Sequence, residues 1–119
     1  MNGKIFKHIG RHIYDLMRAE KKGLLCDMRG FLSFQILWLL SKRDMCGDAI
    51  AEEIGNRRGV KPKAGTIYPA LKYLNEGDLI DGKKVGKTIV YSLTNKGRYA
   101  LGIAKKNFVR SFGDIISDL

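Results

Sequence analysis

The chain has 119 residues, 45% of them hydrophobic, which fits one domain with one small core. No apolar run approaches the ~18 residues of a membrane span, and the first residues lack the apolar centre of a secretory signal. We therefore expect a cytoplasmic protein with no membrane partner. Cys26 and Cys46 are too few for a disulfide framework and lack the spacing of a zinc site, so no cofactor is predicted.

The charge is strongly positive, with 22 Lys and Arg against 12 Asp and Glu, a formal charge of +10. Residues 57–98 hold ten of the basic residues and three of the acidic ones, so most of the excess lies there. Such concentrated charge favours a polyanionic partner, either nucleic acid or an anionic membrane surface.

The first half of the chain predicts three helices. Apolar residues recur at helical spacing from residue 4 to about 22. Residues 30–42 are apolar on nearly all sides, as in a helix at the centre of a fold. Cys46 and Gly47 form a turn or very short strand, and a helix of about ten residues follows, with Asp48 as its N-cap.

Residues 55–66 are rich in Gly and basic residues and are predicted to form a loop. An amphipathic helix follows and ends at Gly77, with four apolar positions on one face: Ile67, Ala70, Leu71 and Leu74. Pro69 would break a helix interior at a cost of ~3 kcal/mol. With Thr66 as the N-cap, however, the proline is the third helical residue, where backbone donors have no helical partner anyway.

Residues 79–93 change to a β pattern with turns at Asp81-Gly82 and at Gly86, which predicts a two-stranded hairpin. Thr94 begins a last helix that carries an apolar stripe. The order predicts a mainly α fold. It is a winged helix-turn-helix with a three-helix core and a two-stranded β-hairpin wing, plus extra N- and C-terminal helices for dimerisation.

Three segments, "MRGFLSFQILWLLSKRDMCGDAIAEEI", "GTIYPALKYLNEGDLI" and "YSLTNKGRYAL", together resemble the PadR family of winged-helix transcriptional regulators. The resemblance covers roughly residues 28–102, and the Tyr-Pro-Ala-Leu-Lys run from Tyr68 to Lys72 is its most specific part. It implies a homodimer that binds double-stranded operator DNA, usually as a repressor, and leaves open whether a small-molecule effector binds. Asp78 stands where the family usually has glycine.

These observations divide the chain into three ranges. Residues 1–27 are predicted to form an N-terminal helix for dimerisation and packing, residues 28–97 the winged-helix DNA-binding domain, and residues 98–119 a C-terminal dimerisation helix. A nucleoid-associated location follows from DNA binding.

Helix 66–77 is predicted to read the major groove, and wing 79–93 to flank the DNA. The candidate DNA-contacting residues are Lys61, Lys63, Thr66, Tyr68, Lys72, Tyr73, Lys83, Lys84 and Lys87. Lys72 is the strongest candidate, because it lies opposite the apolar face. Tyr68 either faces the groove or packs partly against the first core helix. The wing lysines either neutralise phosphates or form a solvated tip.

The apolar stripe of the last helix has no core of its own, which predicts contact with a second subunit. The candidate dimer interface comprises Ile5, Ile9, Ile13, Leu101, Phe108, Phe112, Ile115 and Leu119. The alternative is that the two terminal helices pack on each other within one chain.

His8, His12 and Asp15 share the spacing of one helix side, but nothing supplies a further ligand, so we predict no metal site. No nucleophile and base are placed together, so no enzyme is predicted. The alternative to a sequence-specific regulator is a winged helix used for protein interaction or for non-specific, chromatin-type DNA binding.

Overall fold

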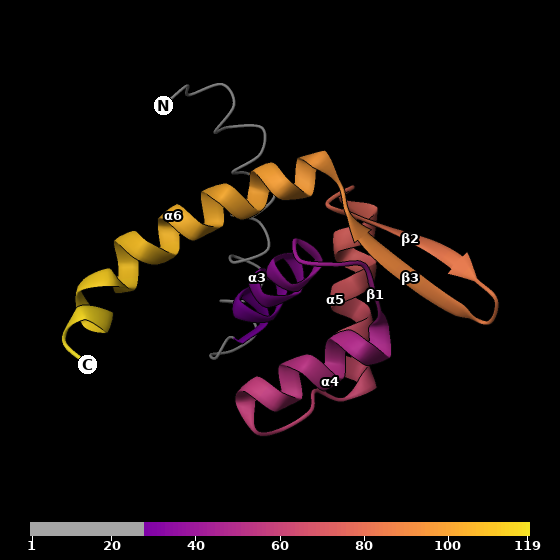
Figure 1. Ribbon diagram of the computed structural model, residues 1–119, viewed down its shortest axis with the longest axis horizontal. Coiled ribbons are helices and arrows are strands. Elements are labelled where there is room, and N and C mark those ends of the chain that lie inside the picture. The colour runs from indigo at the N-terminus through magenta and orange to yellow at the C-terminus, as the bar shows by residue number, and fades with distance from the viewer. Residues whose placement is uncertain (1–27) are drawn as a thin grey trace.

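The computed structural model describes residues 28–119, which form four helices and a small antiparallel sheet (Figure 1). The elements in chain order are α3 (Met28–Leu40), β1 (Met45–Cys46), α4 (Gly47–Arg58), α5 (Ala64–Glu76), β2 (Ile80–Val85), β3 (Thr88–Leu93) and α6 (Asn95–Ser117). The helix predicted over residues 4–22 lies outside the described residues. The predicted winged helix-turn-helix order, three helices followed by a hairpin, is confirmed.

Helix α3 is the centre of the core, as its nearly uniform apolar character predicts. Five of its side chains are almost fully buried: Leu32, Ile36, Leu37, Leu39 and Leu40. The predicted inward face of α5 packs against it through Ile67, Ala70, Leu71 and Leu74. Each such Leu or Ile contributes about 1.5–3 kcal/mol to folding, so burial of these faces holds the three helices together. None of the described helices has the length and hydropathy needed to span a membrane.

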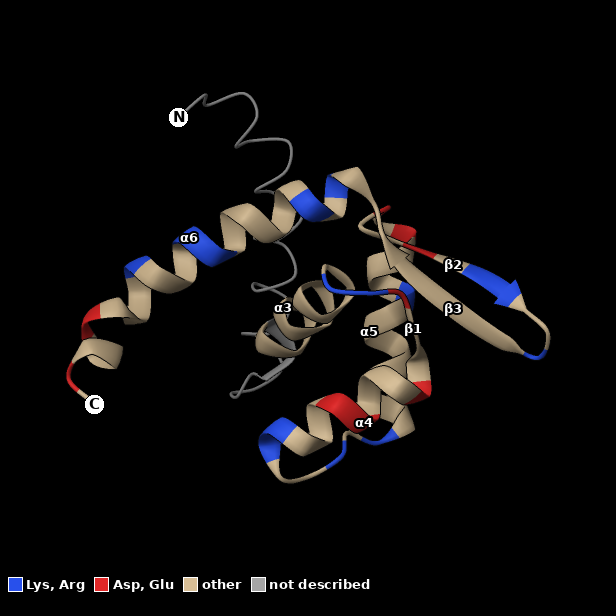
Figure 2. Ribbon diagram, in the orientation of Figure 1, with Lys and Arg blue, Asp and Glu red and all other residues tan. Residues whose placement is uncertain are grey.

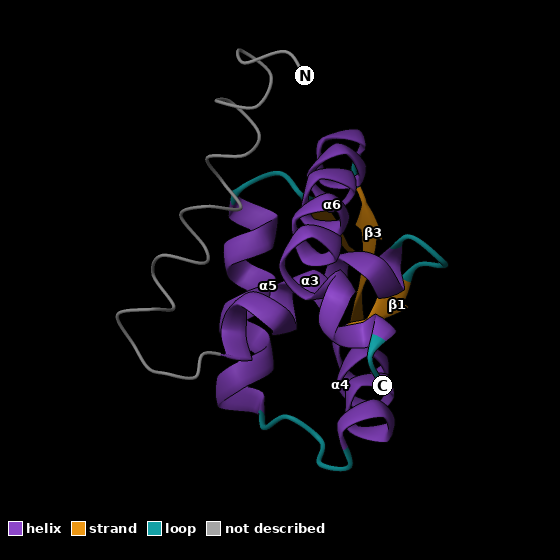
Figure 3. Cartoon of the chain, turned by 90° about the vertical axis from the view of Figure 1, so that its left-hand side faces the viewer, coloured by secondary structure: helices purple, strands orange, loops and turns teal. Residues whose placement is uncertain are grey.

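The sheet has the strand order β1-β3-β2, so the short strand predicted near Cys46 adds a third strand to the hairpin. Figure 3 shows α5 on the left, the strands β1 and β3 on the right and α3 between them. Val85 pairs with Thr88, which leaves Gly86 and Lys87 as a two-residue turn. Gly86 has a φ of 64°, as the first residue of a type II′ turn requires.

The turn predicted at Asp81-Gly82 is wrong, because both residues lie inside β2. A Cβ on Gly82 would lie 2.9 Å from Tyr91 Cε1 and 3.0 Å from Ile89 Cγ2. The glycine therefore makes room for two cross-strand side chains rather than for a turn.

Helix α6 begins at Thr94, as predicted; Thr94 is its N-cap, and its Oγ1 accepts a hydrogen bond from the Gly97 N–H at 2.9 Å. The same hydroxyl lies 2.6 Å from the carbonyl oxygen of Asp78 and 3.0 Å from that of Leu79. Asp78 has a φ of 61°, a conformation that glycine adopts more easily. Thr94 thus joins the end of α5, the base of the wing and the start of α6.

Two predicted caps are wrong. The N-cap of α4 is Cys46, which makes no side-chain capping bond, and Asp48 lies in the first turn. The N-cap of α5 is Lys63, whose carbonyl oxygen accepts from the N–H groups of Thr66 and Ile67. Residues 55–66 are therefore not all loop, since α4 continues to Arg58 and α5 begins at Ala64.

Pro69 consequently is the sixth residue of α5, not the third. At that position it leaves the carbonyl of Gly65 without its usual helical donor. Both residues are exposed, so water can satisfy the carbonyl. The cost is small enough for the buried face of α5 to offset.

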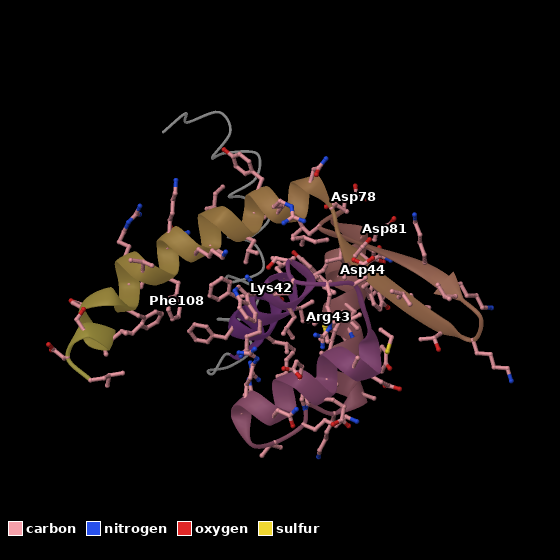
Figure 4. The ribbon with its side chains drawn as sticks, in the orientation of Figure 1. Lys42, Arg43, Asp44, Asp78, Asp81 and Phe108 are labelled. Atoms are coloured by element: carbon pink, nitrogen blue, oxygen red, sulfur yellow. The ribbon has the colours of Figure 1, made fainter. Side chains whose placement is uncertain are left out.

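Helix α6 packs on α3 through aromatic rings. Phe108 points from α6 toward α3 (Figure 4), with its ring centroid 5.6 Å from that of Phe34 and 5.1 Å from that of Phe112. Phe112 in turn lies 6.0 Å from Phe31. These separations are those of favourable aromatic pairs.

Leu101, predicted at the dimer interface, is only 3% exposed and belongs to the core of this chain. Its side chain is therefore not available to a second subunit. The apolar stripe was assigned to a partner because sequence spacing cannot show that α3 lies beside it. Helix α6 also runs without a break across the predicted boundary at residue 98.

Candidate nucleic-acid interface

The outer face of α5 is exposed along its length, opposite the buried face. It carries four of the candidate residues, all exposed: Thr66, Tyr68, Lys72 and Tyr73. At 100° per residue, Lys72 lies close to the centre of this face, while Tyr68 and Tyr73 lie on its two flanks. A groove of DNA could therefore meet Lys72 first and one tyrosine on either side.

Tyr68 takes neither of the two predicted orientations in full. Its side chain is 43% exposed, and its hydroxyl donates a hydrogen bond to Asp48 Oδ1 at 2.8 Å. Its ring lies against the start of α4, where a Cβ on Gly47 would come within 2.9 Å of Tyr68 Cε1. The ring thus contacts α4, and glycine is needed at position 47 for space.

The hydrogen bond to Asp48 is the main reason that the pKa of Tyr68 is raised above its ordinary value, with burial second. Ionisation would remove the proton that the carboxylate accepts and place two negative charges side by side. Tyr68 therefore stays protonated at neutral pH and keeps its donor directed at Asp48.

Lys61 in the loop before α5 is held by a carboxylate of α4. Its Nζ lies 3.0 Å from Glu52 Oε1, and this hydrogen bond is the main reason that the pKa of Lys61 is raised. Gly55 allows the loop to pass so close, because a Cβ there would lie 2.8 Å from Lys61 Cα. Lys63, also exposed, is the backbone N-cap of α5.

The wing separates charge along its length. Asp78 and Asp81 lie at its base (Figure 4), whereas exposed lysines occupy the outer part of β2 and the turn (Figure 2). Lys83 pairs with Val90 and Lys84 with Ile89, and successive strand residues point to opposite faces. The three wing lysines therefore do not crowd one side of the tip, and only part of the set can face one DNA strand.

Two further arginines, Arg57 and Arg58, turn toward α3 instead of the interface. Arg57 lies over the Trp38 ring at 4.8 Å from its centroid, and Arg58 Nε donates to Gln35 Oε1 at 3.0 Å. Lys42 lies over the same ring at 5.0 Å. These cations pack against the edge of the core, where Trp38 is partly buried.

Three residues near the interface were not among the predicted ones. Asp48 and Glu52 lie four apart on α4 and so share one helix face. We call them the acidic face of α4. Gly65 lies in the first turn of α5, is exposed, and would place an added Cβ in open space. The Gly-Thr run before Tyr68 could have indicated Gly65 from the sequence. Nothing in the sequence of α4 indicated that Asp48 and Glu52 contact Tyr68 and Lys61.

The comparisons with known proteins agree with this geometry. Residues 36–103 match the model of a family described as the transcriptional regulator PadR-like family. The match includes α4, α5, both wing strands and the start of α6. No curated protein matches the chain.

Several solved structures are similar over most of the chain. A PadR-like transcription factor from Bacteroides fragilis has a TM-score of 0.67 and 25% identity, covering 76% of this chain and 92% of that one. A PadR family transcription regulator from Clostridium difficile has a TM-score of 0.63 and 28% identity, covering 74% and 96%. RosR from H. salinarum has a TM-score of 0.63 and 26% identity, covering 73% and 89%.

Proposed function

This chain belongs to the PadR-like family of transcriptional regulators, and on that premise we propose that it binds operator DNA sequence-specifically as a homodimer and represses transcription. Helix α5 would enter the major groove, and the hairpin β2–β3 would flank it. The second candidate, a non-specific DNA-binding module, uses the same surface without a preferred sequence.

The observation that carries this proposal is the exposed outer face of α5 beside basic flanking segments. Lys72 lies on that face, and exposed lysines border it in the preceding loop and on the wing. Lysines placed on both sides of a helix can bind the two phosphate backbones that border a groove. The core residues of α5 hold this helix in place, so the face is presented rigidly.

The proposed homodimer is supported by the outer end of α6. Its last turns extend past the aromatic contact with α3 and expose Ile115 at 57% and Ile116 at 50%, and Leu119, just after the helix, is 98% exposed. An apolar surface of this kind is typical of a subunit interface. Two subunits could then place their α5 helices about one duplex turn, ~34 Å, apart.

The DNA-binding proposal is tested by measuring the affinity for a mixed duplex pool at increasing salt. Each phosphate that the protein neutralises contributes a slope of about −0.9 in log K against log[salt]. An affinity that does not change with salt would contradict DNA binding. Competition by random duplex against selected duplex then separates the two candidates, because only a sequence-specific protein prefers the selected one.

The assembly is tested by light scattering of the full chain and of an Ile115→Asp variant. A dimer has twice the 13.4 kDa mass of the chain, and a charge at Ile115 should shift the variant toward the monomer. A wild-type mass equal to one chain at working concentration would contradict the homodimer.

A further inference from the structure

We propose that Asp48 sets the hydrogen-bonding direction of Tyr68, so that the Tyr68 hydroxyl accepts from the amino group of an adenine or a cytosine in the major groove. This inference rests on the proposed function and names the base chemistry that one residue of α5 would recognise. Asp48 is then a positioning residue, and Tyr68 is the contact.

The contact is built from three residues on two helices, α4 and α5. The Tyr68 hydroxyl lies 2.8 Å from Asp48 Oδ1, across the junction of α5 and α4. The absence of a side chain on Gly47 lets the ring lie against α4, because a Cβ there would come within 2.9 Å of it. Both ends of the tyrosine are therefore constrained, the ring by space and the hydroxyl by a hydrogen bond.

The remaining surface of the tyrosine is open to a ligand. Tyr68 is 43% exposed, on a flank of the outer face of α5 whose centre holds Lys72. Asp48 makes no cap for α4, whose N-cap residue Cys46 has no side-chain capping bond. The carboxylate accepts its hydrogen bond from the tyrosine while it lies in the first turn of its own helix.

The groups that the Tyr68 hydroxyl can bind follow from the single proton that it carries. A phenol hydroxyl has one proton to donate and two lone pairs that accept. A carboxylate partner takes that proton in a charge-assisted hydrogen bond, which is stronger than a neutral one. The oxygen of Tyr68 can then offer only lone pairs to the DNA.

Donor groups in the major groove are few. Adenine presents its N6 amino group and cytosine its N4 amino group, whereas guanine O6 and N7, adenine N7 and thymine O4 are acceptors. Phosphate oxygens are acceptors too, and the negative charge of Asp48 repels them. Tyr68 therefore selects a base with an exocyclic amino group and does not serve as a phosphate contact.

The test is selection from a duplex library, randomised over about two helical turns (~20 bp), by four proteins: wild type, Asp48→Asn, Asp48→Ala and Tyr68→Phe. Wild type should enrich adenine or cytosine at one position of each half-site. Asp48→Asn should keep this preference, because its amide oxygen still accepts the hydroxyl proton. Asp48→Ala frees the hydroxyl to donate as well, so guanine and thymine should become about 3- to 10-fold better tolerated there.

A second measurement uses the selected duplex with the preferred adenine replaced by purine, which lacks the N6 amino group; if cytosine is preferred, 4-deoxy-cytosine takes its place. Wild type should lose about 3- to 10-fold in affinity, and Tyr68→Phe should lose nothing further. A structural role of Asp48 alone would lower the melting temperature without changing base preference.

The possible failures are separable. If Asp48→Ala binds the selected duplex with the base preferences of wild type, the inference is overturned and the proposed function stands. If wild type binds no duplex in a salt-dependent way, both are overturned.

Discussion

The hydroxyl of Tyr68 on α5 donates to the carboxylate of Asp48 on α4, and one helical turn further along α4 Glu52 binds Lys61 in the loop between the two helices. The acidic face of α4 thus contacts two of the side chains that the sequence assigns to DNA. If a duplex docks on α5 as proposed, Glu52 would compete with its phosphates for Lys61.

The substitution Glu52→Gln should strengthen DNA binding. It removes a negative charge beside the interface and releases Lys61 for a phosphate, which makes the slope of log K against log[salt] steeper by about 0.9. Filter binding or fluorescence anisotropy at several salt concentrations measures both quantities.

Glu53→Gln is the matched control for Glu52→Gln. It changes the net charge equally at the neighbouring position, but Glu53 pairs with Arg57 at 4.0 Å instead of with Lys61, and Arg57 lies over the Trp38 ring. An equal gain in affinity for the two variants would show that net charge, not release of Lys61, is responsible.

Lys72→Ala should weaken binding to a selected duplex more than Lys84→Ala does. Lys72 projects from the middle of the outer face of α5, whereas Lys84 pairs with Ile89 on the wing, where we expect it to contact the DNA backbone. For both variants the slope of log K against log[salt] should fall by the contribution of about one phosphate contact. Lys72→Ala should also lower the preference for the selected sequence. Unchanged affinity of Lys72→Ala for the selected duplex would contradict the assignment of α5 as the reading helix.

Gly65→Ala should raise the stability of the protein and lower its affinity for DNA. The added Cβ meets no atom within 4 Å and Gly65 has no positive φ, so the protein should gain up to about 1 kcal/mol of stability from the better helix propensity of alanine. The methyl group would nevertheless stand on the surface that approaches DNA, so affinity should fall. Thermal unfolding and duplex titration check the two effects.

Gly102→Ala on α6 provides the comparison, since a Cβ there also meets nothing within 4 Å. It should stabilise the protein to a similar extent and leave DNA affinity unchanged. If Gly65→Ala retains full affinity, the backbone at the start of α5 does not approach the DNA closely.

Thr94→Val should destabilise the protein by about 1–2 kcal/mol, because it removes the N-cap of α6 and the hydroxyl beside the carbonyls of Asp78 and Leu79. Thr94→Ser keeps the hydroxyl and should cost much less. Urea unfolding of both variants gives the difference, and equal midpoints would show that the hydroxyl does not hold the base of the wing.

Helix positions and buried faces followed from the sequence because periodicity is a local property. Ile67 and Leu74 lie seven residues apart, and any helix that contains them brings them to one side. The start of the last helix at Thr94 also followed from the sequence, and its hydroxyl caps an N–H only three residues away. The helix starts at Asp48 and Thr66 were misassigned for the opposite reason. Both residue types favour caps, but where the helical hydrogen bonds begin depends on the path of the preceding chain.

The turn predicted at Asp81-Gly82 was also wrong because local residue preference does not include contacts with a paired strand. The dipeptide favours a turn, yet Gly82 lies in β2. Glycine is needed at this strand position because Tyr91 and Ile89 of the paired strand occupy the space where a side chain would be. Register across a hairpin, not local preference, determines that requirement. Leu101 likewise belongs to the stripe of α6 by its spacing and to the core by its neighbours.

The amino-acid sequence alone was sufficient for the order of the elements, the inward faces of the helices, the excess of positive charge around α5 and the family resemblance, since each depends on residues close together in the chain. The hydrogen-bond partners of Tyr68 and Lys61 could be identified only in the folded structure, because Asp48 lies 20 residues from Tyr68 and Glu52 nine residues from Lys61. Hydrogen bonds at such separations depend on how α4 crosses α5. The core residues between the two helices fix that crossing, and no spacing in the sequence encodes it directly.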